Sequence, residues 1–330
     1  MKSTLRLFLF VIILVAVQSV PAQQRVMSVR TFDVTSGISS SMAFDVVKDD
    51  YGFIWTSTRL GIDCFDGQNF KHYSLSKNDM RMADDGVRHD LLYIDHNIYV
   101  YSDLGRIGHY REDIDDFEEL CNVKPFLGGH SLHDLYIDEE NYVLGLYNGL
   151  YILDRKDLTV KDETLKGANI HCIIPFSEKT FLVGCNQGLW LFDLAHNTSE
   201  MLACPNLDIK CLYYDQEQRQ VWMGTIGEGL WTFRLDTQTV AQVPNYEHVI
   251  ITCISPYAGT QMLVGADGDG ILQTSRLFTS PLVLLAGTSS EALLEVPSSA
   301  IQGMYVDDVN VWSTTYDNGV VLLGPNSLTG

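Results

Sequence analysis

Basic residues are scarce in this chain of 330 residues, which has 22 lysines and arginines against 42 aspartates and glutamates and a formal net charge of −20. A field of that sign repels the phosphates of nucleic acids and the headgroups of anionic lipids. It also disfavours a highly sulfated glycan as a ligand. The charge balance therefore excludes nucleic-acid binding and contact with anionic membranes as the main function.

Long apolar runs are missing after the N-terminus. The only such run, Leu7 to Val17, is too short to span a bilayer, follows the basic residues Lys2 and Arg6, and precedes small residues. This pattern predicts a signal peptide over residues 1–22, so the mature chain, residues 23–330, is exported to the periplasm. The alternative is an N-terminal anchor that stays uncleaved.

Motifs for metals, cofactors and catalysis are also missing. The seven cysteines include no CxxC pair, which argues against zinc and thioredoxin-like sites, although an exported chain could form disulfides. No GxSxG, HExxH or kinase signature occurs. The run from Asp267 to Gly270 alternates carboxylates with glycines but lacks the other ligands of a calcium loop. We predict no metal, no cofactor and no catalytic residue; Asp45 and Asp90 are the candidates if a glycosidase carboxylate pair exists.

An internal repeat of roughly 40 to 45 residues is present, the period typical of propeller blades. The clearest unit, residues 44–74, alternates four strand-like segments with Asp/Gly turns. Each unit has a turn glycine before its third strand: Gly61, Gly105, Gly149, Gly188, Gly229, Gly270 and Gly319. Five units close the first-strand turn with an aspartate, which suits that turn chemistry: Asp50, Asp95, Asp138, Asp215 and Asp307.

These columns predict an all-β fold, a seven-bladed β-propeller with four-stranded antiparallel blades in one domain. The last unit has a strand over Val320 to Leu323 but no outer strand of its own, whereas Met27 to Asp33 reads as a strand before the first unit. We expect the N-terminal strand to complete the last blade and close the ring, which removes an open sheet edge.

The first unit resembles the two-component regulator propeller repeat, through Gly37-Ile38-Ser39-Ser40, the block at 49–58, Gly61-Ile62 and the FDG at 65–67. Later units resemble it more loosely, 221–233 being the next best. The resemblance implies a periplasmic, oligosaccharide-sensing propeller of a hybrid histidine kinase, either the first propeller of a larger sensor or a truncated product. Relatives of this kind add a second propeller, a β-sandwich, a membrane helix and a kinase, so this chain itself is not expected to be an enzyme.

The turns between second and third strands offer side chains suited to carbohydrate hydroxyls and ring faces. They share one face with the connections between blades, and loops on a rigid scaffold often bind ligands. We take these as candidate ligand-binding residues: Arg59, Tyr147, Asn148, Asn186, Gln187, Glu228, Tyr316, Asp317 and Asn318. The alternative for each residue alone is ordinary turn chemistry.

A second candidate set follows the first apolar position of each inner strand, where every unit has a polar residue. These could form a polar ring in the central channel: Asp45, Asp90, His133, His171, Lys210, Thr252 and Gln302. The ring would bind a sugar or ion, or would simply be a hydrated channel lining. The next position holds three of the seven cysteines, Cys172, Cys211 and Cys253, which we interpret as small packing residues.

Three functions remain open from the sequence. The first is a periplasmic oligosaccharide sensor. The second is a scaffold for protein interaction, with a second propeller or another copy of the chain as partner. The third is a propeller glycosidase or lyase.

Overall fold

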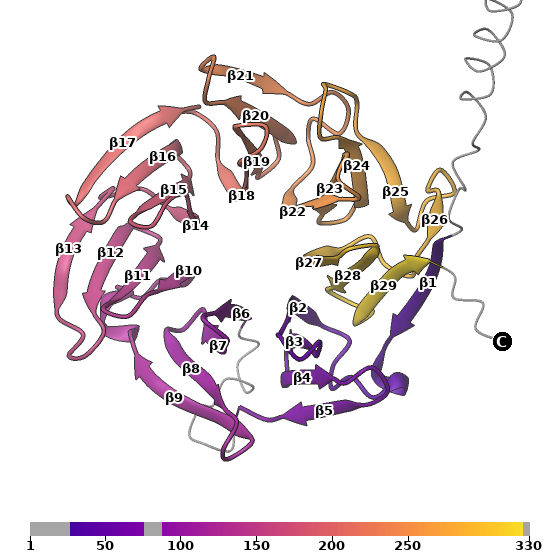
Figure 1. The fold of residues 1–330 in the computed structure, drawn as a ribbon, viewed down its shortest axis with the longest axis horizontal. Helices are drawn as coiled ribbons and strands as arrows, with labels where there is room; N and C mark the ends of the chain where they lie inside the picture. Colours follow the sequence, from indigo (N-terminus) through magenta and orange to yellow (C-terminus); the bar gives the residue numbers. More distant parts are fainter. Residues whose placement is uncertain (1–26, 76–87, 326–330) are drawn as a thin grey trace, which may run out of the picture.

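Seven antiparallel sheets stand around a central axis in the computed structural model, which describes residues 27–75 and 88–325 (Figure 1). This confirms the predicted seven-bladed β-propeller. The predicted signal peptide, residues 1–22, lies outside the described residues. No helix in the described part of the chain is long and apolar enough to cross a bilayer.

The first three blades follow one another along the chain, each from the channel outwards. Blade 1 comprises β2 (Ala43–Lys48), β3 (Ile54–Thr58), β4 (Gly61–Phe65) and β5 (Phe70–Tyr73). Blade 2 comprises β6 (His89–Ile94), β7 (Asn97–Ser102), β8 (Arg106–Arg111) and β9 (Asp116–Asn122). Blade 3 comprises β10 (Leu132–Ile137), β11 (Asn141–Leu146), β12 (Gly149–Asp154) and β13 (Val160–Thr164).

Blades 4 to 6 continue the ring in the same order. Blade 4 comprises β14 (Ile170–Pro175), β15 (Thr180–Cys185), β16 (Gly188–Asp193) and β17 (Thr198–Ala203). Blade 5 comprises β18 (Ile209–Asp215), β19 (Gln220–Thr225), β20 (Leu230–Arg234) and β21 (Thr239–Gln242). Blade 6 comprises β22 (Ile251–Tyr257), β23 (Gln261–Ala266), β24 (Gly270–Ser275) and β25 (Val283–Gly287), with a short parallel addition, β26 (Leu294–Glu295), that the sequence did not predict.

Blade 7 is built from both ends of the described chain, as predicted. It comprises β27 (Ile301–Asp307), β28 (Asn310–Thr315), β29 (Val320–Pro325) and, outermost, β1 (Met27–Phe32). The pairs run from Phe32 with Val320 to Met27 with Pro325. Phe32 is 2% exposed and its ring contacts Trp312 of blade 7 and Phe65 of blade 1. Closure therefore pairs backbone within blade 7 and packs aromatic rings against blade 1. Two 3₁₀ turns, η1 (Val34–Ser36) and η2 (Lys124–Phe126), complete the described elements.

The hydrophobic core is divided between the blades. One buried cluster lies between each pair of neighbours in the described ring, such as the one joining Trp55 and Ile62 of blade 1 to Ile98 and Phe117 of blade 2. Second strands are buried along almost their whole length, whereas outer strands such as β21 are largely exposed. Burial of apolar area on both faces of each inner sheet holds the ring together.

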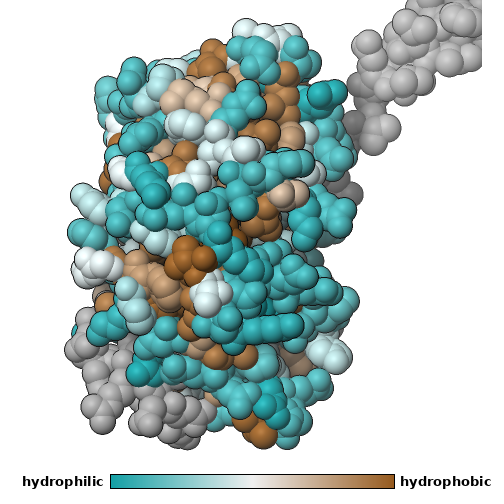
Figure 2. Space-filling view, turned by 90° about the vertical axis from the view of Figure 1, so that its left-hand side faces the viewer, coloured by the Kyte–Doolittle hydropathy of each residue, from teal (hydrophilic) through white to brown (hydrophobic). Residues whose placement is uncertain are grey.

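The outer wall is mostly hydrophilic on the side of blades 3 and 4. Figure 2 shows the side on which β13 and β17 run, and its surface is mostly hydrophilic, with apolar spots that stay separate. Two of the exposed apolar side chains on these strands are Val160 and Met201. Scattered residues of this kind are normal on a protein surface and do not define a binding area.

All seven predicted turn glycines have positive φ, in the region that side chains rarely adopt. At Gly61, where φ is +138°, a Cβ would also lie 2.3 Å from the carbonyl oxygen of Tyr73. The glycine column therefore predicted the blades correctly, because the turn between the second and third strands needs this backbone conformation.

The register of the inner strands corrects two of the sequence columns. Pairing with the second strand gives Val46 of blade 1 and Leu91 of blade 2 the position that Leu135 has in blade 3. The residues taken from the first two units for the sequence columns therefore lie one position too late. The aspartate that closes the first turn of blade 1 is accordingly Asp49, whose Oδ1 accepts the backbone amides of Tyr51 and Phe53. In blades 3 and 5, Asp138 and Asp215 accept such amides, as expected.

Candidate ligand-binding cleft

The two faces of the propeller differ in what they carry. The turns after the first and third strands of each blade lie on one side, which we call the lower face. The turns after the second strands and the connections between blades lie on the other, the upper face. The sequence predicted ligand-binding residues on the upper face. A cleft lined by aromatic and polar side chains opens on the lower face.

This cleft, the first cleft, has a volume of about 480 Å³ and lies between blades 1 and 2. Four turns bring its rim together, those joining β2 to β3, β4 to β5, β6 to β7 and β8 to β9. Its wall includes the central residue of the blade 1 repeat, Trp55, with Cys64 and Lys71 beside it on β4 and β5. A concave site of this size, with aromatic walls and a few polar groups, is typical of small-molecule binding.

An aromatic cluster forms the wall of the first cleft. The Trp55 ring lies 4.8 Å from that of Tyr110 and 5.6 Å from that of Tyr73, measured between centroids. At the mouth, Tyr51 is 75% exposed and Phe53 is 38% exposed, with their centroids 6.3 Å apart. Since aromatic rings of this kind combine apolar faces with polar edges, they suit ligands that have both kinds of surface.

Two carboxylates hold this wall in place. Asp49 Oδ2 accepts the indole N–H of Trp55 at 2.7 Å. Asp115 Oδ1 accepts the hydroxyls of Tyr73 and Tyr110 at 2.8 and 2.9 Å, and its other oxygen pairs with Lys71. These hydrogen bonds fix the orientation of the rings before a ligand arrives, which lowers the cost of binding.

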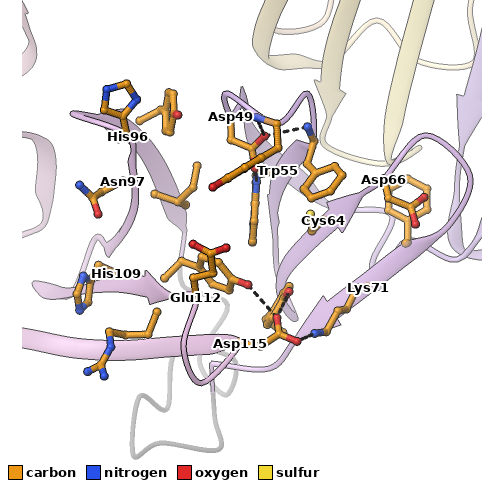
Figure 3. Close-up of a pocket in the computed structure, with 18 of the residues that line it drawn as sticks. Asp49, Trp55, Cys64, Asp66, Lys71, His96, Asn97, His109, Glu112 and Asp115 are labelled. Atoms are coloured by element: carbon orange, nitrogen blue, oxygen red, sulfur yellow. Dashed lines mark hydrogen bonds and ion pairs between the residues drawn. The ribbon is translucent and has the colours of Figure 1, made fainter.

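The opposite side of the first cleft supplies polar groups. Figure 3 shows His96, Asn97 and His109 along that side, across the space from Trp55. The backbone oxygen of Asp95 accepts from the Asn97 amide, which leaves the amide oxygen as an acceptor. His96 pairs with Asp50, and His109 lies 3.5 Å from Glu118. Imidazole and amide groups from this side, with the carboxylate of Glu112 from the β8–β9 turn, thus share one cleft with the aromatic wall.

Two acids of the first cleft, Asp66 and Asp115, are stabilised in the ionised form. Lys71 first, then Tyr73 and Tyr110, lower the pKa of Asp115 to about 2. The backbone amides of Asn69 and Gln68 lower the pKa of Asp66. Burial, with help from Asp115, raises the pKa of Tyr110 to about 12. A carboxyl with a lowered pKa is a poor general acid near neutral pH, so Asp66 and Asp115 suit binding better than proton transfer.

The nine ligand-binding residues predicted from the sequence lie apart from this cleft. All sit in upper-face turns of blades 1, 3, 4, 5 and 7, and all are exposed except Asn318, which is half-buried. Tyr147 stacks on His130 with 4.3 Å between ring centroids, and Asn186 accepts the backbone amide of Asn169. The structure therefore distributes the set around the ring. As a binding surface it remains a prediction.

The seven predicted channel residues are all half-buried on the inner strands. The register divides them, because His133, His171, Lys210, Thr252 and Gln302 are bulged residues, whereas Asp45 and Asp90 occupy the next position. That next position is occupied elsewhere by Asp134 and the three cysteines. The predicted polar ring is therefore divided into two sets of residues, which occupy adjacent positions on the inner strands.

Several of these polar groups join neighbouring blades. Asp45 accepts the backbone amide of Leu91 at 3.0 Å, linking β2 to β6, and Asp134 accepts that of Ile173 at 2.6 Å. Burial, then the nearby Asp90, raises the pKa of Asp45 to about 6.

Other members of the two sets make similar bonds. His133 donates to the carbonyl of Ile170, Thr252 to that of Ile301, and His171 to the carboxylate of Asp208. Asp90 pairs with Arg88, which also donates to Gln302. These bonds give the groups a structural role, whereas ligand binding there remains a prediction.

The three inner-strand cysteines occupy equivalent places, as predicted. Each sulfur packs against a glycine of the adjoining second strand: a Cβ on Gly184, Gly224 or Gly265 would lie 2.4 to 2.6 Å from it. All seven cysteines of the chain are free thiols. Among the described residues no three His, Cys, Asp or Glu side chains gather as metal ligands, the Asp267 to Gly270 turn included.

The residues of the first cleft were missed because they lie in different units. Trp55 lies in the repeat block at 49–58 and Asp66 in the FDG at 65–67, so the sequence presents both as repeat positions. The cleft appears only when the lower turns of blade 2 are placed beside those of blade 1. The available signal was the density of aromatic residues in the first unit, residues 44–74, which is higher than in the other units.

No family model and no curated protein matches the chain. Solved structures do. The extracellular domain of a protein assigned to a hybrid two-component system in B. thetaiotaomicron has a TM-score of 0.70 at 16% identity, over 89% of this chain and 41% of that one. Another extracellular domain from B. thetaiotaomicron, assigned to a one-component system, has a TM-score of 0.73 at 21% identity, over 90% and 40%.

An enzyme is also among the similar structures. Catalytically inactive virginiamycin B lyase from Staphylococcus aureus, solved with quinupristin, has a TM-score of 0.68 at 14% identity, over 91% of this chain and 99% of that one. At such identities these likenesses show the propeller fold alone, which hosts many functions. This chain spans about two fifths of the two extracellular domains.

Proposed function

We propose that this protein is a non-catalytic, periplasmic propeller that senses oligosaccharides for a two-component regulator. The observation that carries the proposal is the first cleft, in which amide, imidazole and carboxylate groups share one space with a fixed aromatic wall. A pyranose ring has apolar C–H faces that stack on aromatic rings and hydroxyls that bond such polar groups. The likeness to extracellular domains of regulatory systems supports a sensor.

Two of the acids in the first cleft, Asp66 and Asp115, support binding without turnover. A glycosidase needs one carboxyl that stays protonated near neutral pH as its general acid. Asp115 and Asp66 are instead stabilised in the ionised form by their donors. The net charge of −20 further favours neutral over uronic-acid sugars, because like charges repel at long range.

A thermal-shift screen with neutral and uronic-acid oligosaccharides tests this proposal. We expect a neutral glycan to raise the melting temperature, since a ligand that binds only the folded state stabilises it. Chromatography of the same mixtures should recover the glycan intact. Release of shorter products would contradict the non-catalytic assignment, and no shift with any glycan would contradict oligosaccharide sensing.

The upper face favours a second candidate function, a scaffold for a protein partner. Five of the seven second-to-third strand turns place an exposed large apolar residue there: Leu60, Leu104, Tyr147, Ile226 and Tyr316. They are spread around the ring but share one face, which a broad protein partner would cover. A second propeller or another copy of this chain would be the partner. Self-association in sedimentation velocity, without any glycan-induced shift, would favour this function.

A further inference from the structure

A second cleft occupies the equivalent place between blades 5 and 6, also on the lower face, with a volume of about 270 Å³. Its central residue is Trp222, which pairs with Thr232 as Trp55 pairs with Cys64 in blade 1. Blade 6 contributes Thr274, at the strand position that Tyr110 occupies in blade 2. The two clefts are therefore versions of one repeat position with different side chains.

The lining of the second cleft is polar and largely uncharged. Its uncharged polar residues include Gln218, Gln220, Thr232, Thr239, Gln242 and Thr274. The two arginines are already paired: Arg234 with Asp236, and Arg276 with Asp215 and Glu217. Because amide and hydroxyl groups can both donate and accept, this lining suits a ligand rich in hydroxyls and without charge.

The indole N–H of Trp222 is a buried donor without an acceptor. The residue is 3% exposed, and its Nε1 has no hydrogen-bond partner among the described residues. The equivalent Trp55 donates to Asp49, but the corresponding acid of blade 5, Asp215, accepts two bonds from Arg276 at 2.6 and 2.7 Å instead. A buried donor left unpaired costs free energy, so an acceptor supplied by a ligand would bind favourably here.

An apolar rim accompanies this donor. Phe278 is 69% exposed and Leu277 is 51% exposed, both in the turn between β24 and β25 that borders the second cleft. An exposed phenyl ring beside a polar cavity offers a stacking face for a sugar ring. The cavity lies just below the roughly 300 Å³ at which pockets for drug-sized ligands begin, which limits the occupant to about one sugar unit.

We propose that the second cleft is a binding site for a single neutral sugar unit, with the Trp222 indole N–H donating to one of its oxygens. The proposal rests on the proposed function that the chain binds oligosaccharides. It goes further, because it adds a site separate from the first cleft and assigns it a smaller, uncharged ligand.

Nuclear magnetic resonance of the indole groups tests the proposal. The chain has five tryptophans, and ¹⁵N labelling gives each indole N–H one signal. Trp222→Phe and Trp55→Phe each remove one signal and so assign it. The full chain is titrated with glucose, galactose, mannose, arabinose and N-acetylglucosamine. We expect at least one to shift the Trp222 signal in a saturable way, and Trp222→Phe to weaken binding of that sugar about tenfold, measured by calorimetry.

A matched variant separates the donor from general packing. Trp222→Phe removes the indole donor but keeps an aromatic ring, and a melting curve checks that this variant still folds. Gln220→Ala tests the lining independently. The proposal is overturned if none of the five sugars moves the Trp222 signal, or if Trp222→Phe binds the active sugar as tightly as the original chain. If the Trp55 signal alone moves, the second site fails while oligosaccharide binding stands. If neither moves and the oligosaccharide screen is also negative, both fail.

Discussion

The first and second clefts occupy the same position in two repeats, and they differ in how their polar groups are paired. In the first, Asp49 bonds the indole of Trp55, and Asp115 bonds two tyrosines and Lys71. In the second, Asp215 is buried against Arg276, and Trp222 has no acceptor among the described residues. The repeat thus fixes where a cleft forms, whereas a few side chains decide which groups remain for a ligand.

The largest contrast is expected at the two cationic residues. Arg276→Met leaves the fully buried carboxylate of Asp215 without its partner, so it should cost about 3–5 kcal/mol of unfolding free energy. Lys71→Met breaks an ion pair in which both side chains are 53% exposed and should cost less than about 1 kcal/mol. Urea denaturation of both variants measures the difference.

A control makes the first contrast specific. Asp215→Asn combined with Arg276→Met removes the buried charge as well as its partner, and should recover part of the loss. Equal costs for Arg276→Met and Lys71→Met would mean that the Asp215 pair is not buried as described.

A smaller contrast is expected at the two tryptophans. Trp55→Phe removes a hydrogen bond to Asp49 and should cost about 1 kcal/mol more than Trp222→Phe, which removes a donor without an acceptor. Both changes lose similar ring area, so the difference reports the hydrogen bond. Chemical denaturation of the two variants without ligand measures it. If Trp222→Phe proves the costlier, the Trp222 indole has a partner in the folded protein.

The smallest effect is expected in acid. The folded-state pKa of Asp115 is about 2, below its ordinary 3.8, so its ionised form stabilises the fold above pH 4. This contribution should fall away as the pH drops from about 4 to about 2. Since the side chain is half exposed, it should be at most about 1 kcal/mol.

Asp115→Asn tests this pH dependence. Melting temperatures measured from pH 2 to 6 should converge with those of the original chain at the acid end and separate above pH 4. A constant difference across the range would show that the pKa of Asp115 is not lowered. The β24–β25 turn of the second cleft has no carboxylate equivalent to Asp115, because residues 276–282 contain no acid.

The sequence predicted the fold because propeller repeats have regular backbone requirements. The seven turn glycines with positive φ, and the pairing of Phe32 with Val320 that closes the ring, follow from features that recur or are plainly missing in one unit. The inner-strand alignment slipped by one residue in the first two units because each has two consecutive apolar residues there, Val46-Val47 and Leu91-Leu92, so the apolar pattern fits two registers.

The binding site could not be predicted in the same way. Tyr51, Trp55 and Tyr110 come together across a seam between two blades, and no local pattern encodes that contact. The repeat also favoured the upper-face turns as the binding surface, because each unit has such a turn at the equivalent position. What distinguishes the first cleft is a departure from the repeat at particular positions, such as Tyr110 where blade 6 has Thr274.

The central claim is that ligand binds between blades 1 and 2 on the lower face. Calorimetry with the glycan giving the largest thermal shift tests it most directly, using Tyr51→Ala, which alters the cleft mouth, and Tyr147→Ala, an exposed tyrosine on the upper face. We predict that Tyr51→Ala weakens binding about tenfold, whereas Tyr147→Ala changes it by less than about twofold. Loss of binding in Tyr147→Ala with normal binding in Tyr51→Ala would contradict the account and place the ligand on the upper face.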